Sequence, residues 1–245
     1  FMYSRFANPT CDAVEKKIAA LEGGAGAMLT SSGQAASMIA ILNLCSAGDS
    51  FIAASTIYGG TINLFGVTLK KLGIECIWAD AEADEEEIQK LFKPNTKAVF
   101  GETLANPALT VFDIEKWANI AHKNSVPLII DNTFATPILC RPIEFGADIV
   151  IHSTTKYMDG HAVQGGGVIV DSGKFDWNAS GKFPDFTEPD ESYHGVVYTR
   201  DFGNMAYIIK ARMQLMRDFG CYPAAHSAFL LNLGLETLPV RMKQY

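Results

Sequence analysis

Short apolar runs alternate with longer amphipathic runs from residue 10 to residue 151. Compact apolar runs bounded by turn residues are typical of buried strands, whereas a period near 3.6 residues is typical of helices. The expected strands cover residues 25–30, 51–54, 74–79, 97–103, 127–130 and 147–151. The expected helices cover residues 10–21, 35–45, 61–72, 84–92 and 113–123. This alternation predicts an α/β fold in which helices sandwich a mostly parallel sheet.

The first helix is expected to be capped by Thr10 or Asp12 and to end at Gly23-Gly24. The alternating pattern stops after residue 170. Residues 173–194 are polar, aromatic and proline-bearing, which predicts a long irregular segment with a functional role. Two more helices are expected, over residues 204–219 and 224–238.

The composition excludes several classes of function. The net charge of −7 gives the chain no overall positive field that would attract nucleic acid or an anionic membrane. No apolar run approaches the roughly 18 residues of a membrane span. The five cysteines are widely spaced, which predicts reduced thiols, a cytoplasmic protein and no metal site. The start, Phe1 to Arg5, looks like neither a signal peptide nor a natural N-terminus.

Lys156 follows the expected strand 147–151, in the run His152-Ser153-Thr154-Thr155-Lys156-Tyr157. A lysine at the end of a buried strand can be desolvated, which lowers its pKa and makes it an amine nucleophile. Taken alone, this run favours an ordinary surface lysine. The other residues at the same edge of the sheet therefore decide between the two interpretations.

Polar residues follow several of the expected strands, at the sheet edge where open parallel sheets bind ligands. Ser32-Gly33-Gln34 follows the first strand and opens a helix, so its free amides can bind a phosphate. Ser153 and Thr155 place hydroxyl groups beside Lys156 for the same phosphate. These features predict an anion site at the carboxyl edge of the sheet.

Tyr58 and Asp131 lie at the same edge. The ring of Tyr58 either stacks on a planar cofactor or packs as an ordinary tyrosine. Asp131 ends an apolar strand, where a carboxylate needs a partner: a protonated ring nitrogen, an arginine, or the start of a helix that it caps. A phosphate-binding turn, a stacking ring, a buried aspartate and a lysine nucleophile together suit pyridoxal phosphate held as a Schiff base.

Seven motifs stand in the order that is found in the Cys/Met-metabolism family of pyridoxal-phosphate enzymes. They are Tyr3-Ser4-Arg5, Asn8-Pro9-Thr10, Ser32-Gly33, Tyr58-Gly59, Glu102 with Asn106-Pro107, Asp131-Asn132-Thr133 and Ser153-Thr154-Thr155-Lys156-Tyr157. The chain resembles this family over essentially its whole length. The resemblance implies the aspartate-aminotransferase-like fold (type I), with a seven-stranded sheet, and pyridoxal 5'-phosphate as the cofactor.

The resemblance also implies three catalytic residues. Lys156 would form the Schiff base with the cofactor and then move protons on the substrate. Asp131 would pair with the ring nitrogen, and Tyr58 would stack on the ring and assist departure of the leaving group.

Further residues would bind the cofactor without taking part in the chemistry. The amides of Gly33 and Gln34 would hold the phosphate, together with the hydroxyls of Ser153 and Thr155. Asn106 would lie near the ring hydroxyl. All of these roles are carried over from the family onto the matching positions of this sequence.

The resemblance implies an assembly as well. Tyr3 and Arg5 would bind the phosphate in the neighbouring subunit's site, although without the resemblance they would be taken for a frayed terminus. The family suggests a homotetramer built of dimers that share active sites. We expect residues 1–9 to be the remnant of an N-terminal arm, 10–222 the cofactor-binding domain, and 223–245 the helical start of a linker. The small C-terminal domain, with the arginine that binds the substrate carboxylate, is expected to be missing.

Within the family, residues 183–189, Ser192 to Gly195 and residues 61–65 resemble the O-acetylhomoserine sulfhydrylase branch, whereas methionine γ-lyases carry cysteine at Gly60. The implied reaction is a γ-replacement that converts O-acetyl-L-homoserine and sulfide (or methanethiol) to L-homocysteine (or methionine) and acetate. Methionine γ-lyase and cystathionine γ-synthase or lyase are the alternatives within the family. A dinucleotide-binding oxidoreductase lacks its Gly-x-Gly-x-x-Gly here, and a non-catalytic relative is a further alternative.

Overall fold

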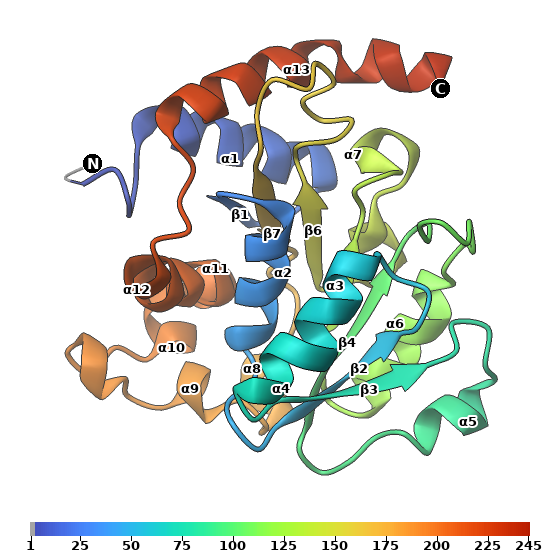
Figure 1. Cartoon of the computed structure of the whole chain (residues 1–245). Helices are drawn as coiled ribbons and strands as arrows, with labels where there is room; N and C mark the ends of the chain where they lie inside the picture. Colours follow the sequence, from blue (N-terminus) through green and yellow to red (C-terminus); the bar gives the residue numbers. More distant parts are fainter. Residues whose placement is uncertain (1–2) are drawn as a thin grey trace.

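The structure, a computed structural model, describes residues 3–245 and contains one seven-stranded sheet (Figure 1). The strands are β1 (Gly26–Thr30), β2 (Ser50–Ala54), β3 (Glu75–Ala79), β4 (Thr96–Glu102), β5 (Leu128–Asp131), β6 (Ile149–Ser153) and β7 (Gly167–Asp171). Their order across the sheet is β1-β7-β6-β5-β4-β2-β3. All neighbouring strands pair in parallel except β7, which is antiparallel to both β1 and β6. The predicted α/β fold is therefore confirmed.

Strand β7 is the one strand that the sequence pattern did not place. It begins at Gly167, directly after two further glycines that indicate a loop, and its apolar stretch is short. A Cβ on Gly167 would lie 2.2 Å from the carbonyl oxygen of Ser32, so only glycine allows this approach. All five residues of β7 are buried because β1 and β6 flank the strand. Its existence thus depends on its neighbours more than on its own sequence.

Helices cover both faces of the sheet (Figure 1). They are α1 (Pro9–Glu22), α2 (Gly33–Leu42), α3 (Gly59–Asn63), α4 (Leu69–Lys71), α5 (Glu85–Gln89), α6 (Ile114–Lys123), α7 (Thr136–Leu139), α8 (Trp177–Ser180), α9 (Pro184–Thr187), α10 (Tyr198–Phe202), α11 (Ala206–Lys210), α12 (Arg217–Phe219) and α13 (Ala225–Gln244). Successive side chains of a strand point to opposite faces. Ser153 of β6 meets the start of α2, whereas His152 meets Glu22 at the end of α1. Helices α1 and α2 therefore lie on opposite faces.

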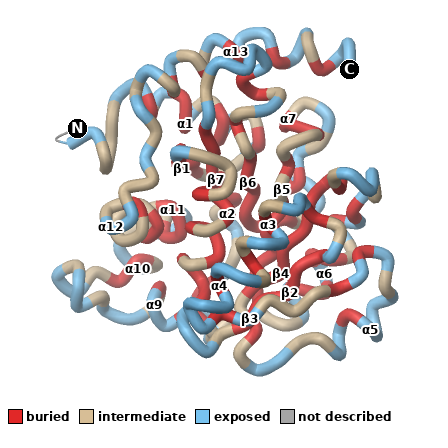
Figure 2. The backbone as a smooth tube through the Cα atoms, viewed as in Figure 1, coloured by how far each residue is buried: buried red, intermediate tan, exposed pale blue. Residues whose placement is uncertain are grey.

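The core is the sheet itself, whose central strands are buried throughout (Figure 2). Both faces are covered, so the central strands are continuous apolar runs, without an alternation of apolar and polar residues. The irregular segment 173–194 contributes to the same core through Trp177, on which the rings of Phe186 and Tyr207 stack. That segment therefore has at least a packing role, and its predicted functional role stays a prediction.

The start of α1 and the end of α5 differ from the sequence predictions. The cap of α1 is Asn8, whose side chain accepts a hydrogen bond of 3.0 Å from the amide of Thr10, and not Thr10 or Asp12. Pro9 then occupies the first helical position, which its fixed φ favours. Helix α5 ends at Gln89, well before Phe92.

The expected helix 204–219 is divided into a 3₁₀ turn (Gly203–Met205), α11, a π-helical segment (Ala211–Met216) and α12. Arg212, within the π-helical segment, pairs with Glu15 of α1 at 2.7 Å and donates to the carbonyl oxygen of Phe6 at 2.7 Å. Contacts with residues about 200 positions away therefore accompany this irregular helix.

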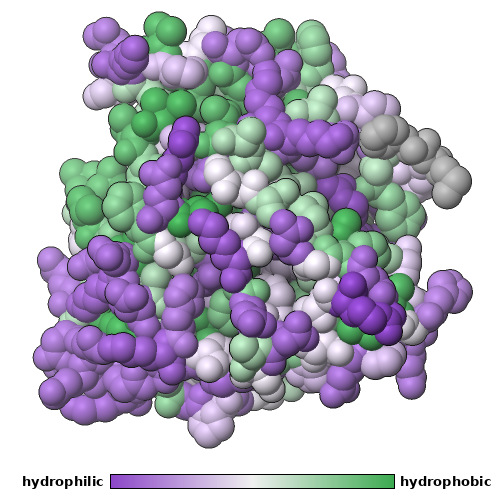
Figure 3. Space-filling model, turned by 180° about the vertical axis from the view of Figure 1, so that it is seen from behind, coloured by the Kyte–Doolittle hydropathy of each residue, from purple (hydrophilic) through white to green (hydrophobic). Residues whose placement is uncertain are grey.

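The surface of the molecule is divided by polarity. Seen from behind, hydrophilic residues gather over the side where α5 lies, and apolar residues gather above them (Figure 3). The first turn of α5, Glu85 to Glu87, is acidic and exposed. Among the described residues, no helix is both long enough and apolar enough to cross a bilayer.

Candidate active site

The carboxyl ends of β4, β5 and β6 open into one pocket of about 250 Å³. Glu102 of β4 pairs with Asp131 of β5 in the parallel ladder, so both carboxyl groups point to the same face. The pocket is lined by Ser32, Gly33, Gln34, Ser37, Tyr58, Thr61, Glu102, Leu104, Asn106, Asp131, Thr133, Phe134, Ser153, Thr155 and Lys156. Eight predicted site residues therefore meet in one cavity: Lys156, Asp131, Tyr58, Gly33, Gln34, Ser153, Thr155 and Asn106.

The start of α2 forms one wall of the pocket. The hydroxyl of Ser32 caps this helix by accepting a hydrogen bond of 3.1 Å from the amide of Ala35. The first amides of a helix have no partner within it, so those of Gly33 and Gln34 are free to bind an anion. A Cβ on Gly33 would lie 2.6 Å from Cβ of Ser153, so glycine allows α2 to approach β6 this closely. This geometry suits a phosphate held between the start of α2 and the hydroxyls that follow β6.

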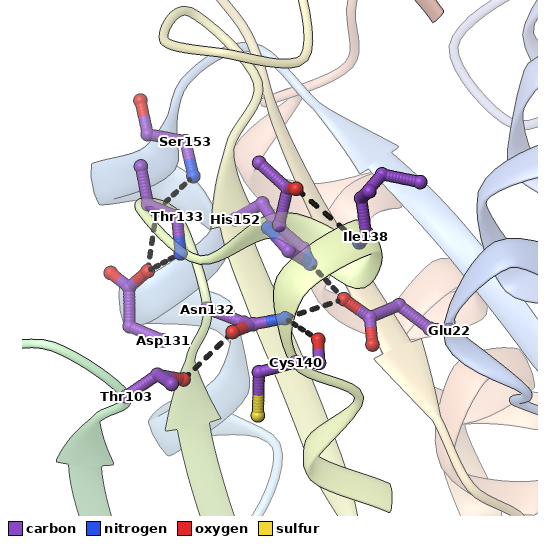
Figure 4. Close-up of polar contacts among 10 residues, drawn as sticks. Glu22, Thr103, Asp131, Asn132, Thr133, Ile138, Cys140, His152 and Ser153 are labelled. Carbon is purple, nitrogen blue, oxygen red and sulfur yellow. Dashed lines mark hydrogen bonds and ion pairs between the residues drawn. The ribbon is translucent and has the colours of Figure 1, made fainter. Parts of the chain in front are cut away.

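Asp131 is held from one side only. Its Oδ1 accepts hydrogen bonds from the amide of Thr133, at 3.0 Å, and from the hydroxyl of Thr133 (Figure 4). Among residues 3–245 its Oδ2 has no hydrogen-bond partner. Burial raises the pKa of Asp131, and the hydrogen bonds from Thr133 and the charge of His152 oppose this rise. A cationic N–H group in the pocket would complete the site by pairing with Oδ2 and stabilising the carboxylate.

Glu102 is a second buried carboxyl group at the pocket, and no role was assigned to it from the sequence. Its Oε1 accepts a hydrogen bond of 2.7 Å from the amide of Tyr58. Burial, and then the charge of Asp131, raise the pKa of Glu102 to about 8, while the amides of Tyr58 and Asn106 oppose this rise. The sequence signal for Glu102 is the same as that for Asp131, because each is an acidic residue at the end of an apolar strand. Glu102 anchors the turn that carries Tyr58.

Tyr58 and Lys156 are the exposed members of the site. The Tyr58 ring is 50% exposed and lies over Gly60, where a Cβ would come within 2.5 Å of its Cε1. Lys156 is exposed as well, and its amine has no hydrogen bond or ion pair within residues 3–245. Among the described residues nothing covers the amine, so the predicted desolvation of this lysine stays a prediction.

Tyr3 and Arg5 do not reach this pocket. Tyr3 is exposed, and the guanidinium of Arg5 lies 5.2 Å from the centre of the Tyr3 ring and 5.1 Å from that of Phe6. Arg5 also donates a hydrogen bond to the carbonyl oxygen of Arg217. Tyr3 is thus exposed and Arg5 half-buried, and both lie outside the pocket.

A buried polar network lies behind the pocket, on the opposite face of the sheet (Figure 4). The side-chain Nδ2 of Asn132 donates to Glu22 Oε1 at 3.0 Å and to the carbonyl oxygen of Cys140 at 2.9 Å. Its side-chain Oδ1 accepts a hydrogen bond of 2.8 Å from the hydroxyl of Thr103. Glu22 Oε1 also contacts His152 Nε2 at 2.5 Å. The sequence did not reveal this network, because Glu22 and His152 are 130 residues apart.

Comparisons with known proteins agree with this geometry. Residues 1–245 match the family described as Cys/Met metabolism PLP-dependent enzyme. The chain is 47% identical to the homocysteine/cysteine synthase of Saccharomyces cerevisiae and 48% identical to the O-acetyl-L-homoserine sulfhydrylase of Corynebacterium glutamicum. All of this chain is covered in both alignments, but only 55% and 56% of these relatives. The chain thus spans just over half their length.

Two solved structures are similar to this one. One is a Campylobacter jejuni chain assigned as an O-acetylhomoserine (thiol)-lyase, which carries a pyridoxyl-lysine phosphate. Its TM-score is 0.93 and its identity 38%, and the alignment covers 97% of this chain and 59% of that chain. The O-acetylhomoserine sulfhydrylase of Wolinella succinogenes has a TM-score of 0.84 and 33% identity, covering 95% and 64%. The match over every residue, the shared fold and the clustered site residues lead to one conclusion: the chain belongs to the Cys/Met metabolism family of pyridoxal-phosphate-dependent enzymes.

Proposed function

We propose that the protein is a pyridoxal-phosphate-dependent transferase that makes L-homocysteine and acetate from O-acetyl-L-homoserine and sulfide, or methionine from methanethiol. The observation that carries the proposal is the single pocket that joins Lys156, Asp131 and Tyr58 to the start of α2. The similarity to named sulfhydrylases supports this branch of the family over methionine γ-lyase and cystathionine γ-synthase or lyase.

The residues present fit the cofactor. The open Oδ2 of Asp131 suits a protonated ring nitrogen, and the free amides of Gly33 and Gln34 suit a phosphate. Ser153 and Thr155 would add hydroxyl donors to that phosphate. Such a cofactor, when bound, supplies an electron sink for charge that develops on the substrate carbons.

The chain's own side chains would do the rest. Asp131 would hold the proton of the ring nitrogen, because a carboxylate favours the charged form of its partner. Tyr58, held at its amide by Glu102, would cover the ring, and Asn106 would lie near the ring hydroxyl. Lys156 would hold the cofactor through its amine and would move protons at the α and β carbons of the substrate. Acetate would then leave from the γ carbon and sulfide would add there.

We also propose a homotetramer of dimers that share sites, with Tyr3 and Arg5 binding the phosphate of the neighbouring subunit. The position of both residues outside this pocket, with Tyr3 exposed, supports this role. Five free cysteines support a cytoplasmic protein. The division into an arm (1–9), a cofactor domain (10–222) and the start of a linker (223–245) remains a proposal as well.

Borohydride trapping followed by peptide mapping of the full-length protein tests the cofactor role. We expect one labelled lysine, Lys156, and no label in Lys156→Ala. The matched control is Lys90→Ala, which replaces an exposed lysine after α5. In this variant Lys156 should be labelled as in the wild type. A label on another lysine would contradict the proposal.

The substrate class is tested with O-acetylhomoserine, with and without sulfide. The proposal expects homocysteine and acetate whenever sulfide is present. If 2-oxobutyrate and ammonia dominate in the presence of sulfide, the protein is a γ-lyase and the transferase assignment is wrong.

A further inference from the structure

The last helix, α13, contacts the loop that carries Lys156. Arg241 Nη1 donates a hydrogen bond of 2.7 Å to the carbonyl oxygen of Tyr157, and Nη2 lies 3.4 Å from that of Met158. On its own helix, the same guanidinium donates to the carbonyl oxygen of Gly234 at 2.8 Å. In Figure 1 the loop between β6 and β7 rises beside α13. Arg241 therefore joins the helix to the two residues that follow Lys156.

These carbonyl groups depend on Arg241. Within residues 3–245, no backbone amide donates a hydrogen bond to the carbonyl oxygen of Tyr157 or Met158. Met158 is buried, so water does not replace the missing donor easily. Arg241 also has no carboxylate partner in this part of the chain, and its Nε donates to the hydroxyl of Thr237 at 3.0 Å. The hydrogen bonds to Gly234 and Thr237 thus hold the guanidinium on α13, and those to Tyr157 and Met158 join it to the loop.

Two glycines show how closely the helix and the loop approach each other. A Cβ on Gly160, in the loop, would lie 2.4 Å from Cζ of Arg241. A Cβ on Gly234, in α13, would lie 2.3 Å from the carbonyl oxygen of Asp159. A group in this narrow space must be flat and must still reach several carbonyl oxygens. The planar guanidinium of arginine has that geometry, whereas the ammonium of lysine does not.

The other end of the loop is held separately. The amide of Thr154 donates to the carbonyl oxygen of Gly166 at 3.0 Å, and Gln164 Nε2 donates to the carbonyl oxygen of Thr154 at 3.2 Å. Lys156 lies between this contact and Arg241. Its exposed side chain has no partner of its own within the described residues, so the backbone on both sides determines where the amine points.

We propose that Arg241 is a positioning residue, which fixes the loop after β6 and so aims the amine of Lys156 into the pocket. The inference rests on the proposed function for the role of Lys156. It adds that the docking of α13 controls how readily this amine reacts.

The experiment compares Arg241→Gln, Arg241→Lys and the control Arg200→Gln in the full-length protein. Arg200 is an exposed arginine on α10, where it pairs only with Asp201. Hydrogen exchange of the peptide that covers residues 154–166 is measured without cofactor. The pH titration of the lysine–cofactor absorbance, kcat and KM are then measured with cofactor.

We expect Arg241→Gln to speed exchange in this peptide at least fivefold, to shift the absorbance titration and to lower kcat at least tenfold, with KM changed less than threefold. Arg241→Lys should recover only part of each effect, and Arg200→Gln should show none. Unchanged exchange and kcat in Arg241→Gln, or full recovery in Arg241→Lys, would overturn the inference. If Arg241→Gln does not fold, the inference is tested by the partial defect expected of Arg241→Lys.

Failure to label Lys156 in the wild type would refute the proposed function and not this inference, because the exchange measurement needs no cofactor.

Discussion

Replacing Gly33 by alanine tests the close approach of α2 to β6. The added Cβ would lie 2.6 Å from Cβ and 2.9 Å from Cα of Ser153, whereas ordinary contacts begin at 3.4 Å. Helix α2 must therefore retreat by about 0.8 Å, the difference between 3.4 and 2.6 Å. Overpacking of this kind costs about 1–3 kcal/mol of stability. The same movement would stretch the hydrogen bonds from the first amides of α2 to a phosphate, so losing about 1.5–3 kcal/mol of binding free energy.

Gly59→Ala is the matched control. Gly59 also opens a helix, α3, but a Cβ there would meet no atom within 4 Å. The entropic gain of Gly→Ala then cancels between the variants, and the contact with Ser153 remains. We expect Gly33→Ala to be about 1–3 kcal/mol less stable than Gly59→Ala in urea unfolding of the cofactor-free protein. Its affinity for pyridoxal phosphate, measured by fluorescence titration, should be about 10- to 100-fold lower. Equal stability and affinity of the two variants would refute this reasoning.

Two further predictions concern the carboxyl groups of the pocket. Asp131→Asn should keep the fold, since the amide oxygen still accepts from Thr133, but lose about 10- to 100-fold in turnover, because it has no charge to hold the ring proton. Normal turnover in a steady-state assay would contradict that role. Burial raises the pKa of Glu102 from its ordinary value of 4.5 to about 8. At a pH between these two values, the carboxyl group is protonated in the native state and ionised in the unfolded state. Stability of the cofactor-free protein should therefore fall by about 1–4 kcal/mol as the pH rises from 5 to 9. Glu102→Gln should make this fall smaller, while the buried carboxyl group of Asp171, whose pKa is raised to about 7, keeps part of it. An equal fall in both proteins, measured by urea unfolding at pH 5 and pH 9, would contradict the reasoning.

Much of the fold could be predicted because its elements have local signals. The apolar runs before Asp131 and Ser153 lie in β5 and β6, as expected. Strand β7 was missed because three glycines precede a short apolar run, and its neighbours in the sheet stabilise it. The start of α1 was misplaced because its cap depends on a single side chain, that of Asn8.

The site could be predicted as a set because parallel strands end at one edge of the sheet. Asp131, Ser153 and Lys156 follow neighbouring strands, so the strand pattern alone places them together. Partners could not be predicted in the same way. The hydrogen bond from Tyr58 to Glu102 joins residues 44 positions apart, and the pattern shows only that both lie at strand ends.

The sequence by itself determined the α/β class, the family and the polar residues that gather at the carboxyl edge of the sheet, because each follows from short runs of neighbouring residues. Only the tertiary structure decided which atoms meet across the chain: Glu22 with His152 behind the pocket, and Arg241 with the carbonyl groups after Lys156. It also decided that Lys156 is exposed in this chain, since burial depends on what packs over a residue. Local propensities act between neighbours in the sequence, whereas burial and long-range hydrogen bonds arise only when distant segments pack together.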